Sequence, residues 1–564
     1  MSEQREVLSS WKEISAYLKR TPRTCQRFEN EMGLPVHRLD GSAKARVFAY
    51  SDELDAWLAQ KVDEHEQAPR KSRRLAILGL AGAGAVAAVA AILILALKAG
   101  PAAGSIAVLP FDDLSPGPGS EELAAGLTED ITDGLGRIHG LRVTGRVTAS
   151  VVKKMGLDAR RTGRALKVRY LIEGSTRVAG PRLRAVARLV EARNGFVLWA
   201  EDFDRPKEDF FAVKDGIASS VAARLGIVLS AREESALRER PTADMQAYEL
   251  YMTGRYLLGR PKPEAPGLAL RYFEEALRRD PKFALAKVGI AWFHINMATL
   301  LLARPNDMGP KAEAAAREAL ALGPDLAEAH AVNAWVQFIY GWNWDAAEAD
   351  FQRALELDPA DGMTRGWYAY FLFSRRRFKE ARKEIGRALA AEPLTPYLHG
   401  LSMWIHVHTG GTEEALKEFR KVQAIEPDFS FAYFGAGLAT LIEGRIDESI
   451  EMFKKSCLLP GTRGWPEAGL AVAYLKKGDR KSAADVYGNL LREWEKTGLV
   501  SAVHVAWAAA AMGDIDRALE LLRTAVRERD PSVVVVHVAT ETSLPRLARD
   551  PRFLAVLDEV GLPR

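Results

Sequence analysis

The stretch WDAAEADFQRALELDP, from Trp344 to Pro359, contains the pattern that decides the fold of about half of this chain. Its small residue Ala347 begins a series of small residues spaced 34 apart: Ala347, Ala381, Ala415, Ser449 and Ala483. Four positions after each of them stands a large residue: Phe351, Ile385, Phe419, Phe453 and Tyr487. Residues four apart share one face of a helix, and small side chains let a second helix approach. The period therefore predicts a stack of packed helices.

Proline marks the end of each repeating unit, because proline cannot continue a helix. The unit ends are Asp280-Pro281, Gly323-Pro324, Asp358-Pro359, Glu392-Pro393 and Glu426-Pro427. In period and pattern, residues 243–530 resemble the tetratricopeptide repeat, with about eight units, and residues 531–564 would form a C-terminal cap. The resemblance implies an α-solenoid whose groove binds a peptide or protein ligand.

Tryptophans are frequent in this part of the chain and have two interpretations. They either line the groove or pack between helices, which is the commoner role of such aromatic side chains. The residues concerned are Trp292, Trp335, Trp342, Trp344, Trp367 and Trp404.

A membrane-spanning helix is predicted from Leu75 to Leu97, which contains only Ala, Gly, Val, Ile and Leu. As a helix this segment would be about 34 Å long, against a hydrocarbon core of about 30 Å. Basic residues tend to stay on the cytoplasmic side of a span. The linker 67–74 contains four of them, Arg70, Lys71, Arg73 and Arg74, so we expect a single pass through a bacterial inner (cytoplasmic) membrane with the N-terminus inside.

One face of the predicted span contains only small side chains, which recur every four residues at Gly79, Ala83, Ala87 and Ala91. Such a face lets two helices approach closely and would permit a homodimer. Chance explains the same stripe equally well in so alanine-rich a segment.

The N-terminal module, residues 1–66, begins with a capping box at Ser10 to Glu13. A second short helix from Thr21, with Pro22 at its first position, ends at Gly33. Segments 36–39 and 46–50 flank an Asp-Gly turn, as in a hairpin, and a third helix follows from Ser51.

These residues resemble the winged helix-turn-helix domain of MerR and excisionase-type proteins. The resemblance implies that the second helix enters the major groove of DNA and that the hairpin contacts its backbone. The implied groove contacts are Arg23, Thr24, Gln26 and Arg27, and the implied phosphate contacts are Arg38, Lys44 and Arg46. The alternative is a solvated basic face on a small protein-binding domain.

The middle domain, residues 105–230, has short apolar strands and amphipathic helices and is expected to be α/β. Its last three strands, 169–178, 182–191 and 196–203, are separated by Gly-containing turns and predict two hairpins. Segments 107–111, 126–129, 171–174 and 198–201 resemble the TolB-N-terminal-like domain, which implies a fold but no ligand.

The chain is thus expected to be multidomain and mainly α: a small winged-helix domain, one transmembrane helix, a small α/β domain and an α-solenoid. Its formal charge of +4 gives no global bias toward nucleic acid, and its two cysteines, Cys25 and Cys457, are expected to be free thiols. No P-loop, HExxH, GxSxG or kinase pattern occurs, so we expect no enzyme, no catalytic residue, no metal and no cofactor.

The layout is similar to membrane regulators of the ToxR and CadC class. It implies a one-component transcriptional regulator that senses a protein or signal outside the membrane and binds DNA inside. The alternative is a membrane-anchored tetratricopeptide scaffold for the assembly of protein complexes, whose N-terminal module binds protein.

Overall fold

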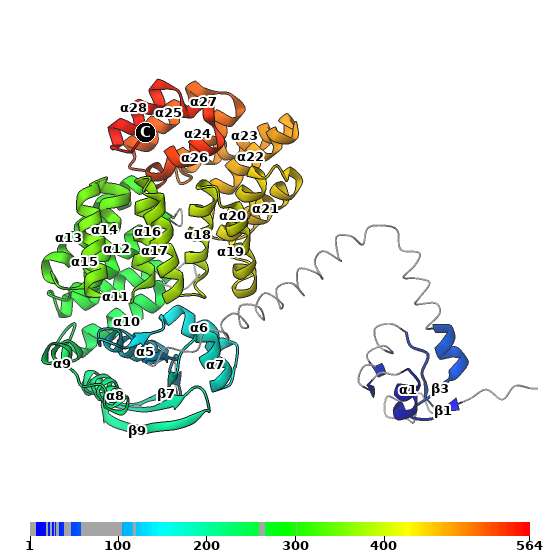
Figure 1. Ribbon diagram of the computed structural model, residues 1–564, viewed down its shortest axis with the longest axis vertical. Coiled ribbons are helices and arrows are strands. Elements are labelled where there is room, and N and C mark those ends of the chain that lie inside the picture. Colours follow the sequence, from blue (N-terminus) through cyan, green and yellow to red (C-terminus); the bar gives the residue numbers. More distant parts are fainter. Residues whose placement is uncertain are drawn as a thin grey trace, which may run out of the picture. The chain divides into compact units, whose positions relative to one another are not determined.

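The computed structural model describes residues 7–18, 21–22, 25–26, 29, 33–38, 47–57, 104–116, 120–258, 265–299 and 302–564. The chain divides into two units, residues 1–84 and 85–564 (Figure 1). The predicted span Leu75 to Leu97 lies outside the described residues, together with its basic flank and its small-residue face. Among the residues that are described, no helix is both long and apolar enough to cross a membrane.

The N-terminal unit contains a three-stranded antiparallel sheet in the order β1-β3-β2, made of β1 (Val7–Leu8), β2 (His37–Arg38) and β3 (Val47–Tyr50). The predicted hairpin is confirmed, because His37 pairs with Phe48 and Arg38 with Val47. Helix α1 (Trp11–Tyr17) is capped by Ser10, whose hydroxyl accepts from the Glu13 amide at 3.3 Å. The Glu13 carboxylate accepts from the amide of Ser9, one residue earlier than in a regular capping box.

The α/β domain is a mixed sheet in the order β6-β4-β7-β8-β9, with β5 paired to β7. The first strands pair in parallel and the last three antiparallel, so both predicted hairpins are confirmed. The strands are β4 (Ser105–Val108), β5 (Asp112–Asp113), β6 (Arg142–Val143), β7 (Tyr170–Ala179), β8 (Arg182–Glu191) and β9 (Phe196–Pro206).

Alternate residues of β4 point to opposite faces of the sheet, and both sets are apolar. Helices therefore cover both faces. Ile106 and Val108 share a core with α5 (Glu121–Gly136) and α8 (Phe210–Arg224). Ala107 and Leu109 share a second core with α6 (Arg146–Lys154) and α7 (Ala159–Leu166). A short helix, α9 (Ala231–Arg238), leads to the repeats.

In the described part of residues 245–527, eight helix pairs form the repeat array, as the period predicted. The first helices are α10 (Met245–Leu258), α12 (Ala284–Thr299), α14 (Ala327–Val336), α16 (Gly362–Ser374), α18 (Pro396–His408), α20 (Ser430–Ile442), α22 (Trp465–Lys477) and α24 (Ala502–Met512). The second helices are α11 (Ala265–Arg279), α13 (Pro305–Leu322), α15 (Trp344–Leu357), α17 (Phe378–Ala391), α19 (Thr412–Ile425), α21 (Ile446–Leu458), α23 (Arg480–Thr497) and α25 (Ile515–Arg527).

The small residues of the period lie on the second helices, and all five are fully buried. The large residue Phe453 shows what they allow, because its ring fits between two glycines on neighbouring first helices. A Cβ atom added at Gly437 or Gly469 would lie 2.7 or 2.6 Å from that ring. The array is therefore packed to contact at the repeat spacing.

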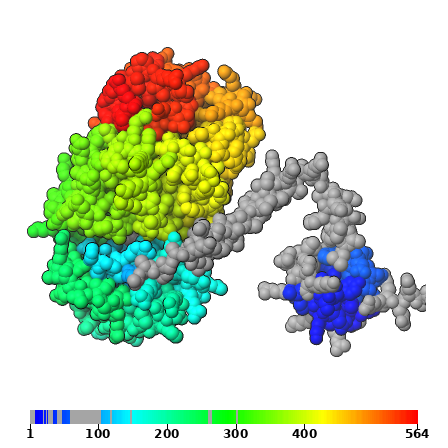
Figure 2. All heavy atoms as spheres, in the orientation of Figure 1, coloured from blue at the N-terminus to red at the C-terminus, as the bar shows by residue number. Residues whose placement is uncertain are grey.

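The chain ends in four short elements, η3 (Pro531–Val535), α26 (Val536–Ser543), α27 (Pro545–Ala548) and α28 (Pro551–Val560). They were expected to cap the last repeat. They also return to the middle of the array, where η3 packs on α16 and on η2 (Gln337–Gly341), and α26 packs on α18. In the space-filling view these residues lie next to the central repeats, and the α/β domain lies against the first ones (Figure 2). No disulfide joins Cys25 to Cys457, both of which are described.

Candidate protein-binding face of the repeat array

Successive first helices place five aromatic side chains next to one another, and we call this set the aromatic face: Trp292, Trp335, Trp367, Tyr370 and Tyr397. Ring centroids are 4.6 Å apart for Trp292 and Trp367, and 5.6 Å apart for Trp335 and Trp367. All five are partly exposed. A partner could therefore cover the rings and gain from burying the area that is still accessible to water.

A hydrogen bond also connects two side chains of the aromatic face. The Trp367 side chain hydrogen-bonds that of Tyr397, and burial raises the pKa of Tyr397 to about 12. Burial also raises the pKa of Tyr370. Both phenols are therefore neutral at physiological pH.

Trp342 and Trp344 do not belong to the aromatic face, although the sequence analysis named them together with its three tryptophans. They line a separate open pocket of about 650 Å³, whose other side is formed by C-terminal residues. The Trp344 indole donates to the carbonyl of Val560 at 3.2 Å, and the guanidinium of Arg529 lies 4.0 Å from the Trp342 ring centroid. Both Trp342 and Arg529 have a left-handed backbone, with φ of +52°. Such conformations persist only where the surroundings enforce them.

Trp404 takes the other predicted role, because it is buried between helices. Its ring lies 5.6 Å from that of Phe434 and 5.5 Å from that of Trp465. The six tryptophans therefore divide into three on the aromatic face, two in the pocket and one in the core.

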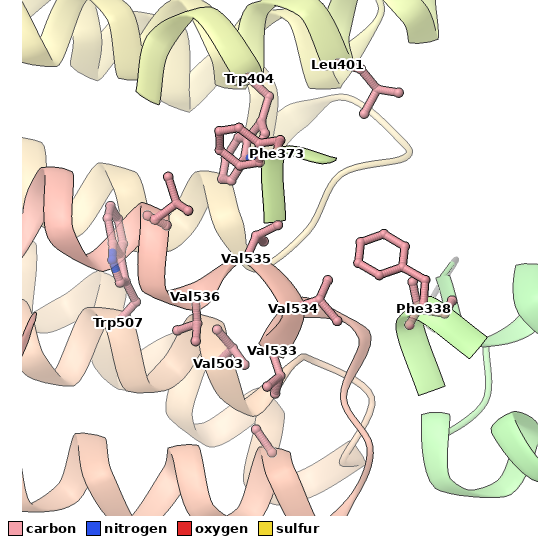
Figure 3. Close-up of a cluster of buried hydrophobic side chains, with 14 of the residues drawn as sticks. Phe338, Phe373, Leu401, Trp404, Val503, Trp507, Val533, Val534, Val535 and Val536 are labelled. Atoms are coloured by element: carbon pink, nitrogen blue, oxygen red, sulfur yellow. The ribbon is translucent and has the colours of Figure 1, made fainter. Parts of the chain in front are cut away.

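The C-terminal segment fills the space between the central and the last repeats (Figure 3). Val533 to Val536 are at most 1% exposed and share a hydrophobic cluster with Phe338, Phe373 and Trp507. Arg376 forms an ion pair with Glu541, and Arg375 donates to the carbonyl of Gly561 at 2.7 Å. The segment packs on α16 and α18, which also carry Trp367, Tyr370 and Tyr397, and it leaves these three side chains partly exposed.

The filled region contains polar atoms without partners. Among the described residues, Thr540 Oγ1, Trp404 Nε1 and Trp507 Nε1 are buried with no hydrogen bond. Burial lowers the pKa of His504 and of His537 to about 3. Both imidazoles are therefore neutral at physiological pH. The region is well packed with apolar side chains, but several of its buried polar atoms have no hydrogen-bond partner among the described residues.

The N-terminal residues implied to bind DNA are only partly described. Arg23, Thr24, Arg27, Lys44 and Arg46 lie outside the described residues. Gln26 is exposed, and Arg38 forms an ion pair with Glu29 at 2.7 Å. The implied phosphate contact Arg38 thus has a carboxylate partner within the unit, and the DNA contacts remain predictions.

Sequence reasoning missed the two tyrosines of the aromatic face. Tyr370 stands three residues after Trp367, a spacing that places both on one side of a helix, and this signal was available. Tyr397 follows Pro396 at the start of α18 and carried no comparable signal.

Comparisons with known proteins identify the repeats. Residues 343–405 match a family model described as a tetratricopeptide repeat. A Rhizobium meliloti (strain 1021) protein named "Putative adenylate cyclase 3" is 37% identical over 191 residues, which cover 34% of this chain and 32% of that protein. ETO1-like protein 2 of Arabidopsis thaliana is 31% identical over 104 residues, 18% of this chain and 11% of that protein. The chain therefore spans about a third or less of these relatives.

Solved structures of repeat proteins are similar at low identity. The Pseudomonas aeruginosa PilF structure is 17% identical with a TM-score of 0.31, covering 40% of this chain and 96% of its own. The human IFIT1 dimer with m7Gppp-AAAA is 16% identical with a TM-score of 0.37, covering 56% of this chain and 77% of its own.

These comparisons favour the alternative for one expectation and contradict another. The chain contains a tetratricopeptide array suited to protein interaction, and nothing in the matches supports a DNA-binding regulator, so the scaffold alternative fits better. The expectation of a non-enzymatic protein is contradicted by the relative that is named as a cyclase. A search for short motifs detects only activities whose residues lie close together in sequence, which is why it could not exclude an enzyme.

Proposed function

We propose that this chain is a membrane-anchored scaffold whose aromatic face binds a peptide segment of a partner protein. The observation that carries the proposal is the aromatic face itself, with three indoles and two neutral phenols left partly exposed in a tetratricopeptide array. Stacked helical repeats use such surfaces to bind extended or helical segments.

The partner chemistry follows from the side chains. Rings with hydrogen-bond donors at their edges favour a segment with apolar side chains and exposed carbonyl or carboxylate oxygens. Tryptophan and tyrosine are also the residues that most often dominate binding energy at interfaces.

The experiment is a selection of peptides from a random library on the purified full-length protein. Peptides that bind the aromatic face should lose affinity by about tenfold or more when Trp335 and Trp367 are both changed to Ala. The control is Trp494→Ala, which removes a partly exposed tryptophan from the second helix α23. If the selected peptides bind both variants as tightly as the unmodified protein, the proposal is wrong.

The membrane anchor in this proposal rests on the composition of Leu75 to Leu97 and the basic residues before it. A topology reporter fused after Gly104 should be active on the outside of the bacterial inner membrane. The N-terminal module is assigned to protein binding, which the ion pair between Arg38 and Glu29 supports, because it leaves that arginine less available for phosphate.

The named relative favours a second candidate function, nucleotide cyclisation. Full-length protein incubated with ATP and a divalent cation should then form cyclic AMP above the level of a heat-inactivated sample. No product with either Mg²⁺ or Mn²⁺ would leave the scaffold as the function.

A further inference from the structure

A pocket of about 360 Å³ lies where the α/β domain meets the first repeats. One wall comes from α5 and α8, and the other comes from α10, Lys282, and the first turn of α14 with the turn that precedes it. The volume lies at the low end of the range of about 300–1,000 Å³ that is typical of small-molecule sites. Neither the aromatic face nor the proposed partner segment involves this pocket.

The inner part of the pocket is acidic. Asp130 accepts one hydrogen bond, from the hydroxyl of Tyr248 at 2.6 Å. A carboxylate can accept about four, so most of its acceptor capacity is unused. Burial raises the pKa of Asp130 to about 6, although the positive charges of Lys214 and Arg255 favour its ionised form.

A second carboxylate lines the opposite wall. Oε2 of Glu328 is buried and has no hydrogen-bond partner among the described residues. An unpaired buried carboxylate oxygen is unfavourable until a donor reaches it. Asp130 and Glu328 thus leave acceptors unsatisfied on both walls.

The outer part of the pocket contains two cations without carboxylate partners, while its exposed carboxylates Glu239 and Asp325 pair with Arg137 and Arg353. Arg240 and Lys282 line it and are exposed, and neither has a carboxylate oxygen within 4.0 Å in the described part of the chain. The other cations of the pocket already have partners, since Arg255 pairs with Glu129 at 2.7 Å, Arg137 with Glu239 at 3.3 Å and Lys214 with Asp215 at 3.2 Å. The two unpaired cations therefore lie at the entrance, and the carboxylate oxygens without hydrogen-bond donors lie inside.

We propose that this pocket binds a free α-amino acid, whose ammonium meets Asp130 and Glu328 and whose carboxylate meets Arg240 and Lys282. The ammonium supplies the donors that the two buried carboxylates lack. The carboxylate remains near solvent, where the two entrance cations hold it. Because the walls belong to different domains, the bound amino acid also joins the α/β domain to the repeats.

The experiment measures binding of the twenty standard amino acids to the full-length protein by calorimetry and by thermal unfolding. At least one of them should bind and raise the unfolding temperature. The N-acetylated and the amidated form of that amino acid should each bind about tenfold more weakly or worse, because each lacks one of the two charges.

Variants distinguish this pocket from other sites. Glu328→Gln and Lys282→Gln should each weaken binding by about tenfold. The matched control Lys417→Gln, which removes a surface lysine paired with Glu413, should leave binding unchanged. The proposal is overturned if no amino acid binds at about 10 mM, or if the blocked forms or the pocket variants bind as well as their controls. None of these outcomes depends on whether a peptide binds the aromatic face.

Discussion

The carboxylate of Glu392 accepts hydrogen bonds from the backbone N–H and the hydroxyl of Thr148, at 3.3 and 3.2 Å. Glu392 ends a repeat, whereas Thr148 lies in the first turn of α6 in the α/β domain. Free amides and a partial positive charge at a helix N-terminus favour such an acceptor. The repeat array thus caps a helix of another domain.

Replacing Glu392 by Ala should destabilise this contact by about 1–3 kcal/mol, because the N-terminus of α6 would lose a buried charged acceptor. Hydrogen exchange of the α6 amides should rise together with a lower unfolding temperature. The control is Glu426→Ala, the same position one repeat later, where the side chain is exposed. Equal exchange of α6 in the two variants would contradict the prediction.

Asp130→Asn should make the protein more stable at pH 7.5. A raised carboxyl pKa contributes stability that is complete below the unfolded value of 3.8 and is lost as pH rises through about 6. The asparagine avoids this loss of up to about 3 kcal/mol, although Tyr248, Lys214 and Arg255 still surround the site. Urea unfolding at pH 7.5 and at pH 4 should show the gain only at the higher pH. If the gain in stability has the same size at both pH values, it comes from packing and not from the ionisation of Asp130.

Gly437→Ala and Gly469→Ala should each destabilise the array by about 1–3 kcal/mol, because the new methyl group would press against the ring of Phe453. The matched control is Gly386→Ala in α17, where no atom lies within 4 Å of an added Cβ. That change should stabilise by about 0.5–1 kcal/mol, since alanine is the better helix residue. Thermal unfolding of the three variants should show a lower unfolding temperature for the first two and a higher one for Gly386→Ala. Equal unfolding temperatures would contradict the prediction.

Acid should destabilise the region around the C-terminal segment. The pKa values of His504 and His537 are lowered to about 3, so the stability they contribute is present above pH 6.5 and is lost as pH falls. Each contributes a slope of about 1.4 kcal/mol per pH unit in that window. His537→Leu should flatten the pH dependence of unfolding between pH 6.5 and 4. An unchanged slope would show that the imidazole is not buried as a neutral group.

The repeats could be predicted from sequence because their contacts are local and periodic. Ala381 and Ile385 share a helix face, and the same geometry recurs in every unit, so the spacing alone indicates the packing. The hairpins could be predicted for the same reason, since the two strands of each hairpin and their turn are close together in the sequence.

Features that depend on distant residues could not be predicted. Helix α6 was missed because its N-cap, Gly145, has no side chain to signal a helix start, and the acceptor comes from Glu392. The run Val533 to Val536 has no periodicity that distinguishes a strand from a buried helix. The pocket near Asp130 combines residues from both domains, and no local pattern relates them.

The C-terminal segment also determines the order of events during synthesis. Val533 to Val536 leave the ribosome after all eight helix pairs, and translation adds about 5–20 residues per second. Until then Phe338, Phe373 and Trp404 lack the valines that cover them in the finished protein. A nascent chain stalled before Pro531 would therefore expose an apolar surface to chaperones, and release of the last residues ends that exposure.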